Sequence, residues 1–141
     1  IGGVVVGDAI CFEVAYDALI REAVLQGAEL IVVPTNNASF GLTAESTQQL
    51  AMSRLRAVEH GRATIQISTV GVSAIIAPDG TIQQRTELFT PAQMLTELPL
   101  RTSLTPADRL GDWPINTAVA LALTGLLGGL LVTRRREDKA P

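Results

Sequence analysis

The first third of the chain alternates between apolar and polar stretches in a way that predicts two buried strands with a helix between them. Residues 4–10 are almost continuously apolar, as in strands that are covered on both faces. Residues 17–26 place apolar side chains at helical spacing, and Gly27 follows where a helix is expected to end. Residues 29–33 form a second apolar run, which Pro34 is expected to close. This order predicts a parallel pair of strands joined by a right-handed crossover, and therefore an α/β fold.

The middle of the chain predicts a loop, a second helix and a small antiparallel unit. Residues 35–42 are polar and rich in turn-forming residues, so a loop is expected at the carboxyl end of the second strand. Residues 44–59 predict a helix, with Leu50, Leu55 and Val58 among its apolar residues. Strands are expected at 63–69, 72–77 and 81–85 with a tight turn at 78–80, and residues 86–112 are expected to form an extended connection with one short strand near 94–98.

The segment 113–133 contains no charged residue and differs from everything before it. About 20 apolar residues suffice to cross a bilayer, and a buried core helix, the alternative, rarely runs this far without a charge. Trp113 is placed as an interfacial anchor, and the arginines at 134–136 put the C-terminus on the cytoplasmic side by the positive-inside rule. The sequence therefore predicts a globular part at 1–112, a transmembrane helix at 113–133 and a basic cytoplasmic tail at 134–141.

Composition narrows the possible functions. The formal charge of −3 and the pI near 5.1 argue against a nucleic-acid partner, which requires a basic face. The single cysteine, Cys11, excludes a disulfide scaffold, and together with the single histidine, His60, it cannot form a zinc site. We therefore expect neither a metal nor another cofactor. Because the chain starts inside an apolar run and without Met, it is expected to be part of a longer protein.

Cys11 ends the first predicted strand and precedes a helix. Such a strand–turn–helix bend exposes a nucleophile, and the backbone N–H of Phe12 can face a developing oxyanion. The alternative is that Cys11, a lone cysteine in an apolar stretch, is only a small buried residue of the core. Glu13 lies in the same apolar run, where burying a carboxylate is costly unless it is paired or has a functional role. His60 is expected to complement the dipole of a helix end and not to pair with Cys11.

Charged residues recur near the end of the second predicted helix. Arg56 and Glu59 are three residues apart, and so are Glu59 and Arg62. With Arg54, they are expected to form a ladder of ion pairs along one helix face, and this interpretation is favoured over a binding role.

Four segments of the chain resemble, in order and spacing, the carbon–nitrogen hydrolase (nitrilase) superfamily: GDAICFEVAY, VPTNNASFG, QLAMSRLRAVEHGR and GVSAIIAPDG. The later LTPADRLGDWP, followed by the apolar segment, resembles the membrane-bound acyltransferases of lipoprotein maturation within that superfamily. The resemblance implies the C-terminal part of an α/β/β/α sandwich. It also implies an enzyme with a Glu–Lys–Cys triad, in which Cys11 is the nucleophile.

In such an enzyme Cys11 would take an acyl chain from a phospholipid as a thioester. The chain would then pass to the α-amino group of the diacylglyceryl-cysteine that begins a lipoprotein. The resemblance assigns the oxyanion to the N–H of Phe12, and Glu13 matches a required glutamate. Asn36, Asn37 and Phe40 resemble the wall of an acyl pocket.

The triad's Glu and Lys precede the cysteine in the family and are not in this chain, and Lys139 is expected on the wrong side of the membrane. Activity would therefore need the missing N-terminal part of the same protein. The expected partners are a phospholipid donor, a diacylated apolipoprotein acceptor and the bilayer, at the outer face of a bacterial inner membrane. Two alternatives stay open, a membrane-tethered amidase of the nitrilase type and a catalytically dead anchored module.

Overall fold

The computed structural model describes residues 2–137, with side chains up to residue 129. It divides into two compact units, Ile1–Arg109 and Leu110–Pro141. Each unit is described here by itself.

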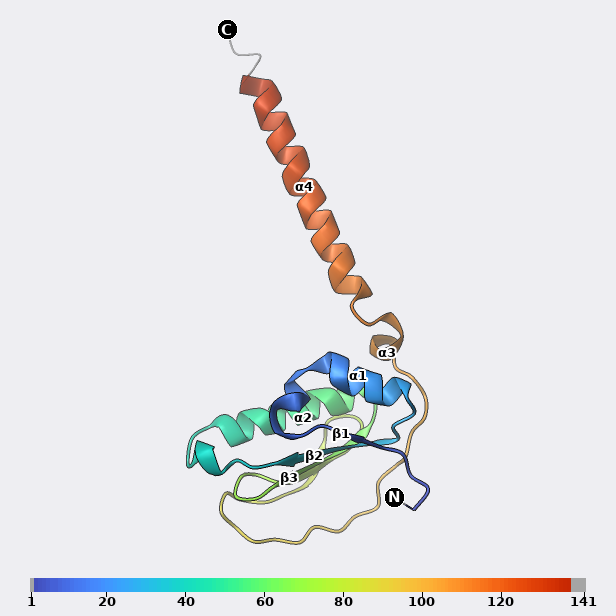
Figure 1. Ribbon diagram of the computed structural model, residues 1–141, viewed down its shortest axis with the longest axis vertical. Helices are drawn as coiled ribbons and strands as arrows, with labels where there is room; N and C mark the ends of the chain where they lie inside the picture. The colour runs from blue at the N-terminus through green and yellow to red at the C-terminus, as the bar shows by residue number, and fades with distance from the viewer. Residues whose placement is uncertain (1, 138–141) are drawn as a thin grey trace. The chain divides into compact units, whose positions relative to one another are not determined.

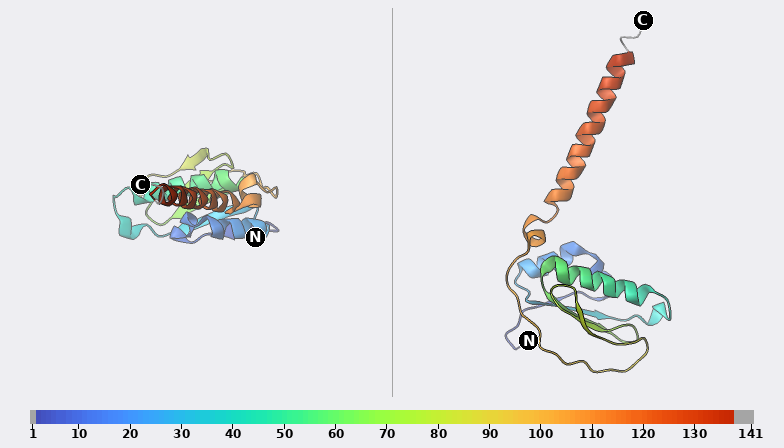
Figure 2. Two further views of the ribbon diagram at one scale, coloured as in Figure 1. Left: turned by 90° about the horizontal axis from the view of Figure 1, so that it is seen from above. Right: turned by 180° about the vertical axis from the view of Figure 1, so that it is seen from behind.

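The first unit is built on one five-stranded mixed sheet with strand order β1-β2-β3-β4-β5. The pairs β1–β2 and β2–β3 are parallel, whereas β3–β4 and β4–β5 are antiparallel. Two helices, α1 (Asp17–Leu25) and α2 (Glu45–His60), cover one face, and the connection after β5 runs across the other (Figures 1 and 2). The predicted α/β fold is confirmed. The strands are β1 Val6–Asp8, β2 Leu30–Thr35, β3 Ala63–Ser68, β4 Ala74–Ile76 and β5 Ile82–Arg85.

Two predictions about strands are wrong. No strand forms near residues 94–98, which lie in the irregular connection. Pro34 does not close the second strand, because β2 continues through it to Thr35. The carbonyl of Val32 accepts a hydrogen bond from the N–H of Ala9, so the backbone of Val32, and of Pro34 two residues later, faces β1. Since β1 has already ended at that point, the missing N–H of proline costs the sheet no hydrogen bond.

The inner face of α2 is largely polar. Leu50 and Ala57 are buried against β4, but Leu55 and Val58, expected as apolar content of this helix, are 55% and 53% exposed. The positions buried instead follow one another at intervals of three or four residues and carry polar side chains: Ser46, Gln49, Ser53, Arg56 and His60. Buried polar groups require hydrogen-bond partners, so this face is held by specific bonds as well as by apolar packing.

The ion-pair ladder expected on α2 is only half present. Arg56 pairs with Glu59, three residues later. Arg62 is fully buried and bonds to backbone carbonyls, at 2.7 Å to that of Ala28 and 2.8 Å to that of Ser103. Its predicted pair with Glu59 is not among the ion pairs of the described residues. Gly61, in the left-handed region at φ 59°, ends α2 and turns the chain so sharply that Arg62 lies inside the fold.

A buried hydrogen-bonded pair of side chains joins the end of α2 to the short helix α3 (Pro106–Leu110). His60 Nδ1 lies 2.6 Å from Asp108 Oδ1, and both side chains are fully buried. The backbone N–H of Thr105 donates to the second carboxylate oxygen at 2.8 Å, and Arg21 of α1 donates to the Asp108 carbonyl at 2.9 Å. His60 thus lies at a helix end, as predicted, and its partner is a residue that the sequence pattern did not suggest.

The second unit contains the helix α4 (Trp113–Glu137). Within the part of the chain that the structure describes, no helix is long and apolar enough to cross a membrane. The transmembrane helix expected at 113–133 is therefore not found, and that expectation is corrected. Of the predicted basic tail, residues 138–141, including Lys139, lie outside the described residues.

Asp108 makes stability dependent on acid pH. Burial alone raises the pKa of its carboxyl, but the hydrogen bonds from His60 and Thr105 outweigh burial and hold the pKa below its usual value. The unfolded chain therefore takes up the proton first, at a pKa of about 3.9, so the free energy of unfolding falls as the pH drops through and below that value.

We predict that Asp108→Asn removes this part of the pH dependence and lowers the free energy of unfolding at pH 7 by about 1–3 kcal/mol. Denaturant titrations of the wild type and the variant between pH 7 and pH 3 measure both effects. Glu97→Gln, at an exposed position of the irregular connection, is the matched control. Equal stability of Asp108→Asn and the wild type at pH 7 would contradict the prediction.

Candidate active site

Cys11 occupies a strained bend at the carboxyl end of β1. It begins the 3-10 turn η1 (Cys11–Ala15) with φ at +54°, in the left-handed region that non-glycine residues rarely adopt. Cys11 forms no disulfide and the residue is partly exposed, so the alternative of a buried core cysteine does not hold. Such a conformation costs about 1–3 kcal/mol and persists only where neighbouring contacts impose it. The contacts around Cys11 therefore decide how the thiol is presented.

Glu13 holds the bend from within. Its Oε2 accepts the N–H of Ile10 at 2.7 Å, while the Glu13 N–H donates to the Ile10 carbonyl at 3.1 Å. These reciprocal bonds form a capping box of Glu13 across Cys11, in which the backbone carbonyl of Ile10 takes the place of the usual side-chain acceptor. Glu13 is exposed, so its carboxylate is not buried in an apolar environment, and it is paired with the backbone N–H of Ile10. The neighbouring Phe12 side chain is 54% exposed and meets the ring of Tyr16 edge-on, with centroids 6.4 Å apart.

The loop after β2 lies at the same edge of the sheet, because parallel strands end on the same side. Asn36 is exposed, and its Oδ1 accepts bonds from Thr69 Oγ1 at 2.9 Å and from the Ala38 N–H at 3.1 Å. Asn37 is buried, and Phe40 ends the short turn η2 (Ala38–Phe40) with its side chain partly exposed. Of the three predicted pocket residues, Asn36 and Phe40 are thus partly or fully accessible, and Asn37 points inward.

A buried network of polar side chains connects this loop to α2 and β3. Asn37 Nδ2 donates to Gln49 Oε1 at 2.7 Å, and Asn37 Oδ1 accepts the hydroxyl of Ser68. Ser68 Oγ in turn accepts the N–H of Gly71 at 2.8 Å, and Ser46 Oγ accepts the N–H of Val72, also at 2.8 Å. The ends of β2 and β3 are therefore tied to one face of α2.

Sequence reasoning missed Gln49, Ser46, Ser68 and Gly71. The usable signal was the recurrence of polar side chains at 46, 49 and 53, which marks one helix face. That pattern is equally typical of a face exposed to solvent, so it could not be assigned without the partners across the sheet.

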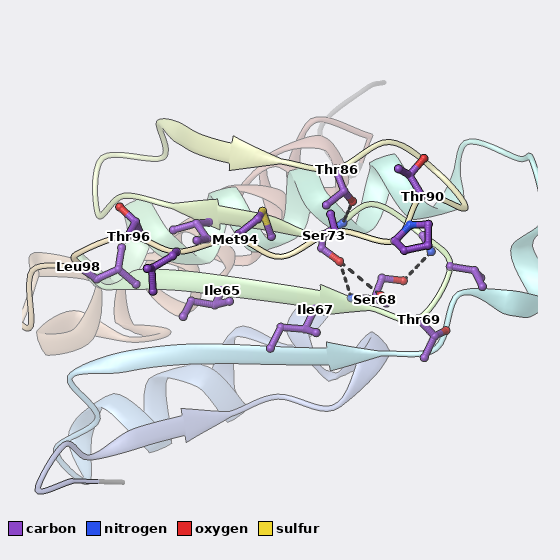
Figure 3. A pocket seen from close by; sticks show the side chains of 16 residues that line it. Ile65, Ile67, Ser68, Thr69, Ser73, Thr86, Thr90, Met94, Thr96 and Leu98 are labelled. Atoms are coloured by element: carbon purple, nitrogen blue, oxygen red, sulfur yellow. Dashed lines mark hydrogen bonds between the residues drawn. The ribbon is translucent and has the colours of Figure 1, made fainter.

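A cavity of about 490 Å³ opens on the opposite face of the sheet, under the irregular connection (Figure 3). The side chains of Ile65 and Ile67 on β3 and of Met94 and Leu98 on the connection form its apolar part. Hydroxyl groups gather at one end, where Ser68, Ser73 and Thr86 lie close to one another (Figure 3). Cys11 is not among the residues that line this cavity. Among residues 2–129, whose side chains the structure describes, no three side chains of metal-binding type come together.

Comparison with known proteins agrees with this architecture. The profile of the family described as carbon-nitrogen hydrolase matches residues 1–103. The chain belongs to the carbon–nitrogen hydrolase family. Members of this superfamily use a cysteine nucleophile, and in this chain Cys11 is the one cysteine.

Curated relatives in the family are apolipoprotein N-acyltransferases. The protein from Mycolicibacterium smegmatis is 48% identical over 139 residues, which cover 99% of this chain and 23% of the relative. The protein from Azotobacter vinelandii is 35% identical over 132 residues, covering 94% of this chain and 25% of the relative. The chain thus spans about a quarter of the length of these curated relatives.

Solved structures of the nitrilase superfamily share the fold. A Nesterenkonia amidase superposes with a TM-score of 0.53 at 22% identity, over 62% of this chain and 36% of the amidase. Nit3 of Saccharomyces cerevisiae gives a TM-score of 0.51 at 19% identity, over 61% of this chain and 34% of Nit3. At this level of identity the likeness concerns the fold alone, and it confirms the nitrilase-like α/β prediction.

The buried network leaves no room for a side chain at Gly71. A Cβ built there would overlap with Asn37 Oδ1 and Ser46 Oγ. We predict that Gly71→Ala displaces these groups and lowers the free energy of unfolding by about 1–3 kcal/mol, measured by thermal or denaturant unfolding. The matched control is Gly128→Ala in α4, where no atom lies within 4 Å of the added methyl group. A Gly71→Ala variant as stable as the control would show that the network tolerates the methyl group.

Proposed function

We propose that this chain is part of an apolipoprotein N-acyltransferase in which Cys11 is the nucleophile. One observation carries the proposal: the cysteine stands in a strained, partly exposed bend, in a chain 48% identical over 139 residues to such an enzyme. In the proposed complete protein, the first unit is the C-terminal part of an α/β/β/α sandwich. Because the chain spans about a quarter of its curated relatives, the activity belongs to that longer protein.

The proposed reaction has two halves. The general base takes the proton of the Cys11 thiol, the thiolate attacks an ester carbonyl of a phospholipid, the C–O bond breaks, and the lysophospholipid leaves with that proton on its oxygen. The α-amino group of a diacylglyceryl-cysteine then attacks the thioester, the C–S bond breaks, the amine gives its proton to the general base, and the thiolate leaves ready for the next turnover. A thioester divides one difficult acyl transfer into two easier steps. The general base Glu and the Lys of the proposed triad would come from the part of the protein that precedes this chain.

Residues beside Cys11 are assigned supporting roles. The backbone N–H of Phe12 would donate to the oxyanion that forms at each carbonyl attack. Glu13 would keep the bend closed through its bond to the Ile10 N–H. Asn36 and Phe40 would face the acyl chain. Asn37, whose amide nitrogen and oxygen both make hydrogen bonds, would instead fix the conformation of the loop.

Both proposed substrates carry acyl chains, so the reaction would take place at a bilayer surface, which raises the local concentration of donor and acceptor. The location of catalysis at the outer face of a bacterial inner membrane stays a prediction.

The first test is a labelling experiment on the full-length protein in detergent. Incubation with a phospholipid that carries a labelled acyl chain is expected to give a protein-bound label that neutral hydroxylamine removes, because thioesters are cleaved by this reagent. Cys11→Ala is expected to abolish the label. Added diacylated lipopeptide is expected to accept the label from the wild type.

The other outcomes of this test favour different functions. A label that is lost to water and never reaches the lipopeptide would favour an amidase-like hydrolase. No label on folded wild-type protein would favour a catalytically dead module. A label that persists in Cys11→Ala would overturn the assignment of the nucleophile.

A second prediction separates the charge of Glu13 from its hydrogen bond. Glu13→Gln keeps an oxygen that can accept the Ile10 N–H, so the rate of thioester formation is expected to stay within about threefold of the wild type. Glu13→Ala removes the acceptor, and the rate is expected to fall by about 10- to 100-fold because the nucleophile is misplaced. Single-turnover labelling measures both rates. Equal losses in the two variants would show that the negative charge is what matters.

A further inference from the structure

The side chain of Gln49 joins α2 to the backbone of Cys11. Gln49 lies in the second turn of α2 and is 3% exposed. Its Nε2 donates to the carbonyl oxygen of Cys11 at 2.8 Å, across 38 residues of sequence. This bond holds the bend from outside, whereas the Glu13 capping box holds it from within.

The orientation of the Gln49 amide follows from its other partners. Its Oε1 accepts Asn37 Nδ2 at 2.7 Å and Thr35 Oγ1 at 3.2 Å. Asn37 is itself oriented, because its own Oδ1 accepts the hydroxyl of Ser68. With its oxygen committed to these donors, Gln49 presents its NH₂ group to Cys11.

The bonded carbonyl belongs to the peptide unit that also carries the Phe12 N–H. A peptide bond is planar, and this one is trans, so its C=O and N–H bonds lie in one plane and point in opposite directions. Anchoring the Cys11 oxygen therefore fixes the direction of the Phe12 N–H. It also limits rotation about the Cα–C bond of Cys11, a residue whose φ is already positive.

We propose that Gln49 is a positioning residue for the acyl-transfer site: it anchors the Cys11–Phe12 peptide plane so that the Phe12 N–H points to the oxyanion. This inference rests on the proposed function, in which Cys11 is the nucleophile and Phe12 supplies the N–H. The oxyanion exists only after the thiolate attacks, so the bond from Gln49 contributes to kcat and little to KM.

The test variant is Gln49→Glu in the full-length protein. It has the same shape and keeps an oxygen for Asn37 and Thr35, but an ionised carboxylate cannot donate to the Cys11 carbonyl. The matched control is Ser53→Ala, one turn further along the same buried face of α2. Ser53 bonds to Gln66 Oε1 at 2.7 Å, with no hydrogen bond to Cys11 described, so its loss weakens the packing of α2 without touching the peptide plane.

Kinetics of thioester formation give the first readout. We expect Gln49→Glu to lower kcat by about 10- to 100-fold with KM for the phospholipid within about twofold, and Ser53→Ala to leave kcat within about twofold. Once protonated, the carboxyl group introduced by Gln49→Glu would again have an O–H to donate. The ratio of variant to wild-type kcat is therefore expected to rise towards one as the pH is lowered through the pKa of that introduced carboxyl group.

A second readout is independent of catalysis. Cysteine labelled with ¹³C at the carbonyl and phenylalanine labelled with ¹⁵N give a directly bonded pair at Cys11–Phe12, which Cys11→Ala identifies by loss of its NMR signal. Loss of the bond to the carbonyl is expected to shift this signal in Gln49→Glu and not in Ser53→Ala.

Each outcome has one meaning. A shifted signal with a lowered kcat supports the proposal, and an unshifted signal overturns it whatever the kinetics. A shifted signal with unchanged kcat, or an equal loss of kcat in Ser53→Ala, also overturns it, because the role would then be structural. If the wild type forms no thioester while the signal shifts in Gln49→Glu alone, the proposed function fails but the anchoring of the peptide plane stands.

Discussion

The polar inner face of α2 is the constraint on which the site depends. Ser46 and Gln49, in the first two turns of α2, are buried near the ends of β2 and β3, and each bonds to a group on a different segment. A buried donor or acceptor without a partner costs about 1–3 kcal/mol, more than a small shift of apolar side chains. Apolar packing alone would let α2 slide over the sheet, whereas these bonds fix its position along the strand ends.

This constraint explains how the strained backbone conformation of Cys11 can be maintained. A cysteine at positive φ relaxes unless both its local turn and its surroundings oppose the relaxation. The Glu13 capping box opposes it within the turn, and Gln49 opposes it from α2. The same network shapes the loop after β2, since Asn37 shares Gln49 as a partner. Cys11 and the loop are thus positioned by one helix face, as the proposed acyl transfer through a covalent intermediate would require.

The two ends of α2 are held by different contacts. Its first turns meet the strand ends that carry Cys11, and its last turn is fixed by the buried pair of His60 and Asp108. The sequence contains one histidine, His60, and in the structure its side chain is hydrogen-bonded to Asp108 in α3. The proposed chemistry therefore needs its general base from the rest of the longer protein, consistent with a chain that spans about a quarter of its curated relatives.

Sequence by itself determined the elements whose signals are local. Apolar runs and glycine stops located β1, α1 and α2, and the Pro78–Gly80 turn located the hairpin of β4 and β5. Motif spacing indicated the family, which the family profile confirms, and predicted Cys11 as the nucleophile. Only the tertiary structure decided which face of α2 is buried, that β2 passes through Pro34, and that Gln49 bonds to Cys11. A polar residue at helical spacing has the same pattern whether it faces water or a buried carbonyl. Its partner, 38 residues away in the case of Gln49, is defined only once the chain has folded.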